Sequence, residues 1–315
     1  MSYTEDVSKL QAGNLFGTNG LNVIITGGGS GLGAYMARSL AVNGASKIFI
    51  IGRRKEALEK TKSSLPEQYN KVIIPLVCDV TSKSSLASLS KEITGTHSTS
   101  AIDVLICNSG ISGPSVATVK PGSQQPLSSV AELSENMLKP DEQEITSTYH
   151  VNLTGIHLTV ATFLPLLDAA NKARPEPTSS TPFKPRPQII TTSSIGGLNR
   201  RPLGNLSYGP SKAGVIHLTK QLATTLVPYD IRANTIAPGL YLSEMTQNSM
   251  KSQGTLDTHN VEGTWGKDVI PATRSGDEED MAGALLYLCS RAGGYVNGCV
   301  LVTDGGRLGV VPGSY

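Results

Sequence analysis

The segment LNVIITGGGSGLG, residues 21–33, joins a continuous apolar run to a glycine-rich turn. Its Val and Ile residues do not alternate with polar ones, which is typical of a strand covered on both faces of a sheet. Gly27, Gly31 and Gly33 follow with G-x-x-x-G-x-G spacing, and a helical stretch begins there. Such a turn lets backbone amides approach a pyrophosphate at a helix N-terminus. The segment therefore predicts a dinucleotide site, and the absence of a following G-K-[ST] excludes a Walker-type phosphate loop.

The same alternation of apolar runs and amphipathic stretches continues along the chain. The runs that we expect to be strands are 21–26, 47–51, 72–77, 103–107, 188–193, 231–236 and 299–303. The stretches that we expect to be helices are 32–43, 55–64, 85–94, a long one near 142–168, 208–226 and 277–290. Strand–helix–strand alternation predicts an α/β fold, a Rossmann-like doubly wound parallel sheet of about seven strands with helices on both faces.

One dinucleotide-binding catalytic domain is predicted over residues 21–308. It lies between an N-terminal lead, 1–20, and a C-terminal tail, 309–315. Three segments interrupt the alternation: 112–141, 169–187 and 240–275. The first two are rich in Ser, Pro or Gly and are predicted to be surface loops. The third is expected to cover the substrate.

Composition narrows the classes of partner. A hydrophobic content of 38% and a charged content of 17% predict a substantial core, and a net charge of +2 favours no nucleic-acid partner. The N-terminus lacks a signal-peptide core and no apolar run approaches membrane-spanning length, so we expect a cytoplasmic protein without a membrane partner. The four cysteines form no C-x-x-C pair and have no local histidine cluster, which argues against a metal site or a disulfide framework.

The end of the second predicted strand bears on the choice of dinucleotide. Gly52 stands where an NAD-preferring site carries Asp or Glu, and Arg53 and Arg54 follow. Two guanidiniums beside the ribose favour a 2′-phosphate, which predicts NADP(H). The alternative is a solvated pair of arginines at a helix start. Asp79, at the end of the third strand, would bond the adenine amino group or act as an ordinary helix cap.

The segment LSYGPSKAGVIHLTKQLA, 206–223, places Tyr208 and Lys212 on one helix face. Hydride transfer to a carbonyl builds negative charge on oxygen, which requires a proton and hydrogen-bond donors. A nearby lysine and the positive nicotinamide of the oxidised cofactor are expected to lower the pKa of Tyr208. An isolated Y-x-x-x-K is more often a surface pair, but Ser193 and Ser194 at a strand end and the glycine turn favour a catalytic group.

These motifs resemble those of the short-chain dehydrogenase/reductase family over nearly the whole chain. The motifs that carry the resemblance are T-G-x-x-x-G-x-G at 26–33, CDV with Asp79, CNSG at 107–110, YHVNLTG around Asn152, YGPSK, APG at 237–239 and TDGG at 303–306. The resemblance implies four catalytic residues: Asn152, Ser194, Tyr208 and Lys212. It implies that the cofactor is bound by Gly27, Ser30, Gly31, Leu32, Gly33, Arg53, Arg54, Asp79, Val80, Asn108, Tyr208, Lys212, Pro238, Gly239 and Ser243.

The resemblance also implies a role for each reacting group. Tyr208 is the acid/base, Ser194 holds the substrate oxygen, and Lys212 grips the nicotinamide ribose and lowers the tyrosine pKa. Asn152 completes a proton relay through an ordered water, and Ser243 contacts the nicotinamide carboxamide.

The sequence departs from the family pattern at several places. Cys107 replaces the first Asn of N-N-A-G and Ser109 replaces its Ala, although Asn108, expected to brace the sheet, remains. Both long loops, 112–141 and 169–187, exceed the family norm. The serine-to-tyrosine interval is about one residue longer than expected, which leaves open whether Ser193 or Ser194 faces the substrate.

The resulting hypothesis is an NADP(H)-dependent oxidoreductase that interconverts a ketone and a secondary alcohol. Tyr241, Met245, Met250 and Trp265 in the substrate segment favour a medium-sized, partly apolar metabolite. The GRR turn at 52–54 and the lead sequence KLQAGNLFG at 9–17 resemble those of fungal reductases, including some near metabolite pathways, which indicates a role in secondary metabolism. The alternatives are an epimerase, dehydratase or cyclase on the same fold, or a dinucleotide-sensing protein without activity.

A homodimer or homotetramer is also expected. The predicted helices 142–168 and 208–226 carry apolar residues beyond those needed to cover a sheet: Val151, Leu158, Val160, Leu164, Leu166, Val215, Leu218, Leu222 and Leu226. Members of the family commonly pair these two helices across a two-fold axis, and a tetramer would also use the C-terminal tail. The alternative is that this surplus packs within one chain.

Overall fold

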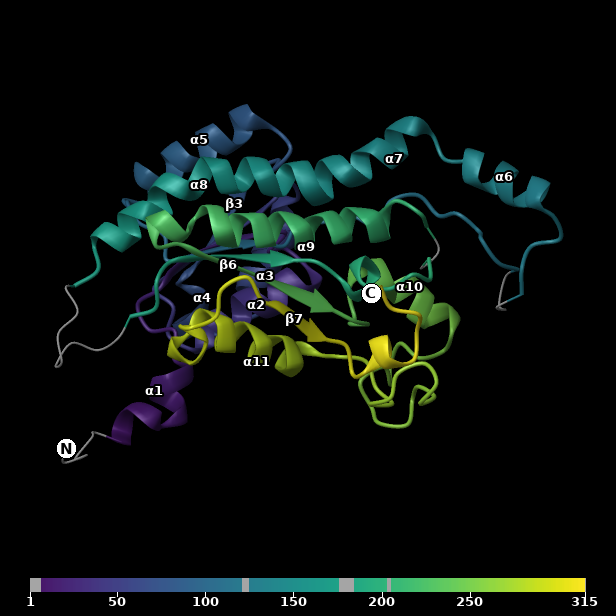
Figure 1. Cartoon of the computed structure of the whole chain (residues 1–315). Helices are drawn as coiled ribbons and strands as arrows, with labels where there is room; N and C mark the ends of the chain where they lie inside the picture. Colours follow the sequence, from purple (N-terminus) through teal and green to yellow (C-terminus); the bar gives the residue numbers. More distant parts are fainter. Residues whose placement is uncertain (1–6, 121–124, 176–183, 203–204, 315) are drawn as a thin grey trace.

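A seven-stranded parallel sheet forms the centre of the protein, in the order β3-β2-β1-β4-β5-β6-β7 (Figure 1). The computed structural model describes residues 7–120, 125–175, 184–202 and 205–314. The strands are β1 Asn22–Thr26, β2 Lys47–Gly52, β3 Ile73–Val77, β4 Val104–Cys107, β5 Gln188–Thr192, β6 Arg232–Pro238 and β7 Val300–Thr303. Every neighbouring pair is parallel, which confirms the predicted Rossmann-like sheet.

Helices connect the strands and cover both faces of the sheet (Figure 1). Their bounds are α1 Ala12–Phe16, α2 Gly31–Val42, α3 Lys55–Ser63, α4 Glu67–Asn70, α5 Lys83–Thr94, α6 Val130–Leu138, α7 Glu142–Tyr149, α8 Gly155–Lys172, α9 Tyr208–Thr225, α10 Glu244–Ser252 and α11 Glu278–Cys289. A π-helical turn, His150–Thr154, joins α7 to α8.

The hydrophobic core is divided into two layers by the sheet. Phe163, from α8, and Val215, from α9, are fully buried on one face, together with side chains of α5. Met36, from α2, and Leu285, from α11, are fully buried on the other face. Successive strand side chains point to opposite faces, so a strand buried on both sides must be apolar throughout.

The stretch Glu142–Lys172 is long and apolar enough to cross a membrane, judged by length and composition alone. This differs from our expectation that no segment approaches that length. Its side chains explain its composition, since Phe163 and Leu167 are fully buried against the sheet and Ile156 is nearly so. The stretch is therefore a core helix of this fold.

The predicted loops contain more helix than expected. Residues 130–138, within the predicted loop 112–141, form α6, which begins where the Ser129 hydroxyl accepts a hydrogen bond from Glu132 N at 3.1 Å. In Figure 1 this helix extends away from the sheet. The predicted loop 169–187 begins late, because α8 continues to Lys172, and residues 176–183 lie outside the described part.

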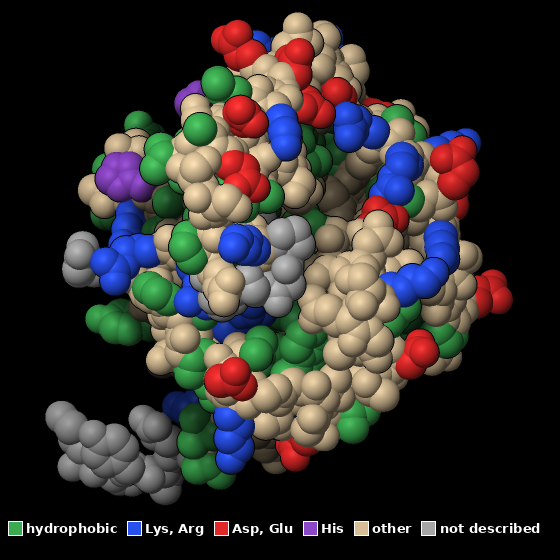
Figure 2. Space-filling model, turned by 90° about the vertical axis from the view of Figure 1, so that its right-hand side faces the viewer, with side chains coloured by type: hydrophobic (Ala, Val, Ile, Leu, Met, Phe, Trp, Pro, Cys, Tyr) green, Lys and Arg blue, Asp and Glu red, His purple; other side chains and the backbone are tan. Residues whose placement is uncertain are grey.

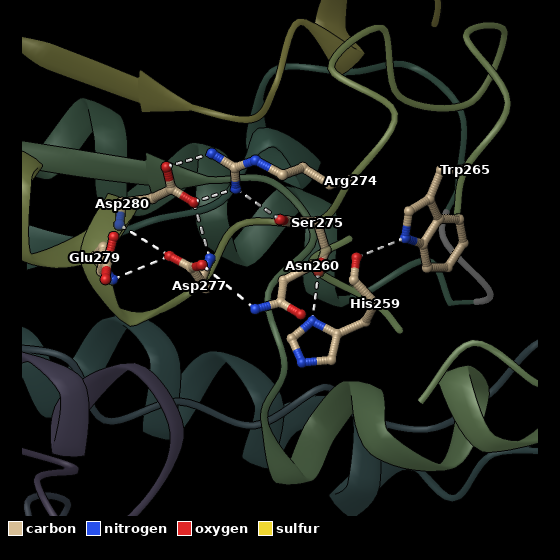
Figure 3. Close-up of polar contacts among 8 residues, drawn as sticks. All are labelled: His259, Asn260, Trp265, Arg274, Ser275, Asp277, Glu279 and Asp280. Carbon is tan, nitrogen blue, oxygen red and sulfur yellow. Dashed lines mark hydrogen bonds and ion pairs between the residues drawn. The ribbon is translucent and has the colours of Figure 1, made fainter. Parts of the chain in front are cut away.

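The segment after α10 is fastened to the start of α11 by polar contacts (Figure 3). Arg274 forms two hydrogen bonds with the Asp280 carboxylate, at 2.6 and 2.9 Å. His259 Nδ1 lies 2.7 Å from Ser275 Oγ, and Trp265 Nε1 donates to the backbone oxygen of His259 at 3.1 Å. The Arg274–Asp280 pair holds the second half of the predicted substrate segment to α11, and the other two contacts hold that half together.

The end of the chain folds back on to the loop that follows β5. Asn199 and Gly313 form an isolated antiparallel bridge. Arg200 N donates to Pro312 O at 2.7 Å, and Ser314 N donates to Leu198 O at 2.6 Å. The C-terminal tail, which together with the last strand we expected a tetramer to use, is therefore partly engaged within the same chain.

Candidate active site

A cavity of about 580 Å³ lies at the carboxyl ends of the strands. β1 has β2 on one side and β4 on the other, so the strand order reverses beside it, which is where open α/β sheets bind ligands. Figure 2 looks on to this end of the molecule and shows a hollow with mixed basic and acidic side chains along its rim. The predicted site residues that line the cavity are Gly27, Ser30, Gly31, Leu32, Arg53, Arg54, Asp79, Val80, Asn108, Ser194, Tyr208, Lys212, Pro238, Gly239 and Ser243. Gly33 and Asn152 lie behind this lining.

The glycine turn is built for close backbone approach. Gly27 has φ +68° and Gly31 has φ +51°, the left-handed region that glycine adopts without strain. A Cβ atom at Gly33 would lie 2.1 Å from Gly27 O, so this glycine lets α2 pack against the turn. Asn108 braces the same turn, since its N–H donates to Thr26 Oγ1 at 3.1 Å and its Nδ2 donates to Gly27 O at 3.3 Å. This cradle is of the kind that admits a pyrophosphate.

The two arginines after β2 have different surroundings. Both are exposed at the cavity, but Arg54 Nη2 lies 2.6 Å from Glu244 Oε2. Asp79 also lines the cavity, and one of its oxygens accepts hydrogen bonds from Thr81 N at 2.9 Å and Thr81 Oγ1 at 2.7 Å. These bonds hold the pKa of Asp79 below its ordinary value. Asp79 thus stabilises a local turn, while Ser82 is the N-cap of α5.

Ser194, Tyr208 and Lys212 meet at the floor of the cavity. Tyr208 is the first residue of α9, and its backbone N–H donates to Asn205 Oδ1 at 2.7 Å. Its side chain is hydrogen-bonded to that of Ser194. Lys212 Nζ lies 5.7 Å from the centre of the Tyr208 ring, one helical turn further on. A phenol, a hydroxyl and an ammonium group therefore converge on one region.

The pKa of Tyr208 is governed first by burial. Burial raises it above its ordinary value, and the hydrogen bond to Ser194 offsets part of this effect. The ammonium group of Lys212 donates to Thr192 O at 2.8 Å, and the lowering that we expect from Lys212 together with the oxidised nicotinamide stays a prediction. Burial also lowers the pKa of Lys212 to about 8, which reduces its charge in mildly alkaline solution.

The two serines after β5 point in different directions. Both line the cavity, but Ser193 Oγ donates to Lys212 O at 2.7 Å, whereas the Ser194 hydroxyl is directed to Tyr208 and Gly196 N. Adjacent side chains in extended backbone point to opposite sides, which is why only one of the two reaches the phenol.

Asn152 has a structural position behind the reacting groups. It is buried in the π-helical turn, where its Oδ1 accepts from Ile111 N at 2.8 Å and its Nδ2 donates to Ile111 O at 2.9 Å and Ser211 Oγ at 3.0 Å. These bonds connect the segment that follows β4 to α9. Gly110 allows this approach, because a Cβ there would lie 3.2 Å from Lys212 Nζ. The relay through an ordered water stays a prediction.

Two residues that line the cavity were not predicted, and two residues that we expected near the substrate lie outside the cavity. Glu244 and Thr192 line the cavity, and neither belongs to a motif that the sequence singles out. Tyr241 and Met245 line it as expected, but Met250 and Trp265 are buried against Ile270 in a separate cluster. Among the described residues, no group of three His, Cys, Asp or Glu side chains is placed to hold a metal ion.

Comparison with known proteins identifies the family. Residues 21–254 match the family model of the short chain dehydrogenases. A short-chain dehydrogenase/reductase from the fungus Diaporthe leptostromiformis, PhomF, is 41% identical over 307 residues, which is 98% of each chain. The chain belongs to the short-chain dehydrogenase/reductase family. The members of this family are oxidoreductases, and the predicted resemblance is confirmed.

More distant members agree with this result. Levodione reductase from Leifsonia aquatica is 30% identical over 290 residues, which is 90% of this chain and 93% of that protein. Among solved structures, the Pseudomonas aeruginosa RhlG/NADP active-site complex has a TM-score of 0.74 and 26% identity, and the match covers 93% of this chain and 98% of the other. The family likeness thus extends well beyond the glycine turn.

Proposed function

We propose that the protein is an NADP(H)-dependent oxidoreductase that interconverts a ketone and a secondary alcohol on a medium-sized, partly apolar metabolite. The observation that carries the proposal is the convergence of Ser194, Tyr208 and Lys212 beside the glycine-lined cavity. A protein that only senses a dinucleotide, or only uses one structurally, does not need this set of groups together.

Tyr208, Ser194 and Lys212 have different roles in the proposed reaction. When bound, the dinucleotide supplies the hydride for reduction of a carbonyl or accepts it in the reverse direction. Tyr208 holds the proton that the carbonyl oxygen takes up, and Ser194 donates a hydrogen bond to the same oxygen. The raised pKa of Tyr208 keeps its phenol protonated, as reduction requires. Lys212 would bind the nicotinamide ribose.

The preference for NADP(H) rests on the charge at the end of β2. Gly52 leaves space where an acidic residue would repel a phosphate, and Arg53 and Arg54 provide two cations at the cavity. The likeness to a solved complex with NADP gives further support. The substrate class rests on Ile111, Tyr241 and Met245, whose apolar surfaces line the same cavity, and the fungal relative supports a role in metabolite pathways.

The proposal is tested by following nicotinamide absorbance while the protein acts on a panel of cyclic and open-chain ketones. Wild-type protein should oxidise NADPH with at least one ketone, and Tyr208→Phe should reduce turnover by about 10²–10⁴-fold while binding NADPH normally. Arg53→Asp should weaken the binding of NADPH by more than about tenfold and the binding of NADH much less. Near-full activity of Tyr208→Phe, or substrate conversion without net hydride transfer, would contradict the proposal.

A further inference from the structure

The start of α10 lies directly against the glycine turn. Tyr35 Oη donates to Leu242 O at 3.2 Å, and a Cβ atom at Gly31 would lie 3.0 Å from Ser243 Cβ. The next residue, Glu244, is the first of α10 and lines the dinucleotide cavity. The substrate segment is therefore in contact with the turn that we expect to hold phosphate groups.

Glu244 forms bonds that a phosphate group would also form. Its carboxylate lies 2.6 Å from Arg54 Nη2 and is hydrogen-bonded to the side chain of Ser30. These two partners lower the pKa of Glu244, so the group is ionised at neutral pH. A guanidinium beside a hydroxyl is a donor set that phosphate oxygens bind well. Arg54 and Ser30 both line the cavity as well.

We propose that Glu244 is a cofactor-specificity residue, whose carboxylate competes with the 2′-phosphate of the dinucleotide for Arg54 and Ser30. This inference rests on the proposed NADP(H) function and deepens it. A cofactor with the 2′-phosphate must displace the carboxylate, whereas a cofactor without it leaves the Arg54–Glu244 pair closed. The preference for NADP(H) is then set by Glu244 together with the arginines after β2.

The exposure of the pair makes such displacement feasible. The side chains of Arg54 and Glu244 are 61% and 55% exposed, so water screens their attraction. Exposed ion pairs contribute little net stability, while a phosphate carries more charge and more acceptor oxygens than a carboxylate. Because Glu244 begins α10, its displacement also removes one of the contacts that fix this helix to the glycine turn.

The test is the Kd of NADPH and of NADH, measured by calorimetry for the wild type and for Glu244→Gln. Glutamine keeps the size and removes the charge. The variant should bind NADPH on the order of threefold to tenfold more tightly and NADH within about twofold of the wild type. The substitution should tighten the binding of adenosine 2′,5′-bisphosphate as much as that of NADPH, and it should leave the Kd of AMP as little changed as that of NADH. In an Arg54→Gln background the gain from Glu244→Gln should disappear.

A matched control is available in the Arg38–Glu278 pair, which joins α2 to α11 at 2.6 Å and lines no part of this cavity. Glu278→Gln should leave both Kd values unchanged. An unchanged NADPH-to-NADH ratio in Glu244→Gln, an equal gain for both cofactors, or the same gain in Glu278→Gln would overturn the inference. If the wild type binds NADH more tightly than NADPH, the proposed cofactor is wrong and the inference fails with it.

Discussion

Ser193 and Ser194 show how much the role of a residue depends on its direction. Ser193 donates to the backbone of Lys212, and Ser194 shares a hydrogen bond with the Tyr208 phenol. A substrate oxygen at the phenol would therefore be within reach of Ser194 alone. Ser193 instead holds the turn of α9 that carries the lysine.

Alanine substitutions should separate these two roles. Ser194→Ala removes a donor to the reacting oxygen and should lower kcat by about 10²-fold. It also removes the acceptor for Gly196 N, which should cost about 1 kcal/mol of unfolding free energy. Ser193→Ala removes a buried hydrogen bond to the Lys212 carbonyl and should cost about 1 kcal/mol of unfolding free energy, with a much smaller change in kcat. Steady-state kinetics and urea unfolding of both variants decide the matter. The opposite pattern in kcat would assign the catalytic position to Ser193.

Lys212 should give cofactor binding a pH dependence. Burial lowers its pKa from 10.5 to about 8, so its positive charge is lost as the pH rises through that value. NADPH affinity should fall above about pH 8, by up to roughly tenfold per pH unit where the charge is required. Lys212→Met should bind weakly at all pH values and lose this dependence. Calorimetry between pH 6.5 and 9.5 provides the measurement, and a wild-type profile that is flat across this range would contradict the role.

Loss of binding at high pH should not be confused with unfolding. The folded pKa of Lys212 lies below the ordinary value, so between about pH 8 and 10.5 the unfolded chain holds the extra proton. This residue therefore favours the folded state increasingly as the pH rises through that window. A thermal melt at each pH separates the two effects.

At the residue level, most of the correct predictions came from the spacing of residues that are close in the sequence. Tyr208 and Lys212 lie four residues apart in one helix, so their shared face follows from the sequence. The Arg54–Glu244 contact joins residues separated by 190 positions, and no motif marks Glu244. The raised pKa of Tyr208 also depends on burial, which only the folded chain defines.

Among the secondary structure elements, β1, β2 and β4 were predictable because they are buried on both faces. A run such as Ile48–Ile51 is fully buried and entirely apolar, so its composition reveals its environment. Helix α6 was missed because the surrounding segment, 112–141, is rich in Ser, Pro and Gly. The residues that form it, VAELSENML, have an exposed Val130 and Leu138, so no buried stripe distinguishes them from a loop.

The N-terminus of α11 is stabilised by the side chain of Asp277, and this cap can be tested. Asp277 accepts hydrogen bonds from Glu279 N at 3.0 Å and Asp280 N at 3.2 Å, and Asn260 contacts it from the substrate segment (Figure 3). Asp277→Ala removes this cap and should lower the unfolding free energy by about 1 kcal/mol. Protease cleavage near residue 260 should become faster. Urea unfolding and timed proteolysis measure both effects, with Glu279→Gln, an exposed neighbour, as control; stability equal to the wild type would contradict the capping role.

For the whole molecule, the structure contradicts only part of the basis for the predicted homodimer. Of the apolar residues that we assigned to an interface, Val160, Leu166, Val215 and Leu226 are buried in the core of a single chain. The partly buried residues that pack against the same core are Leu158, Leu164, Leu218 and Leu222. Val151 lines the cavity. The four core residues need no second copy to cover them, whereas the four partly buried leucines leave surface that a second copy would cover.

The homodimer stays a prediction on the family resemblance and on the outer surface of α8 and α9. Ala161 and Ala213 are exposed there, with His157 and His217 one turn away on the same faces. Small side chains let two helices approach closely, and a two-fold pairing of these faces would form a closed dimer. Light scattering after size exclusion should give a mass of twice the 33.1 kDa chain, or four times for a tetramer. Arg at 161 or 213 (A161R, A213R) should reduce it to one chain, and A87R, on the exposed side of α5, should not. A wild-type mass of one chain at micromolar concentration would exclude the dimer.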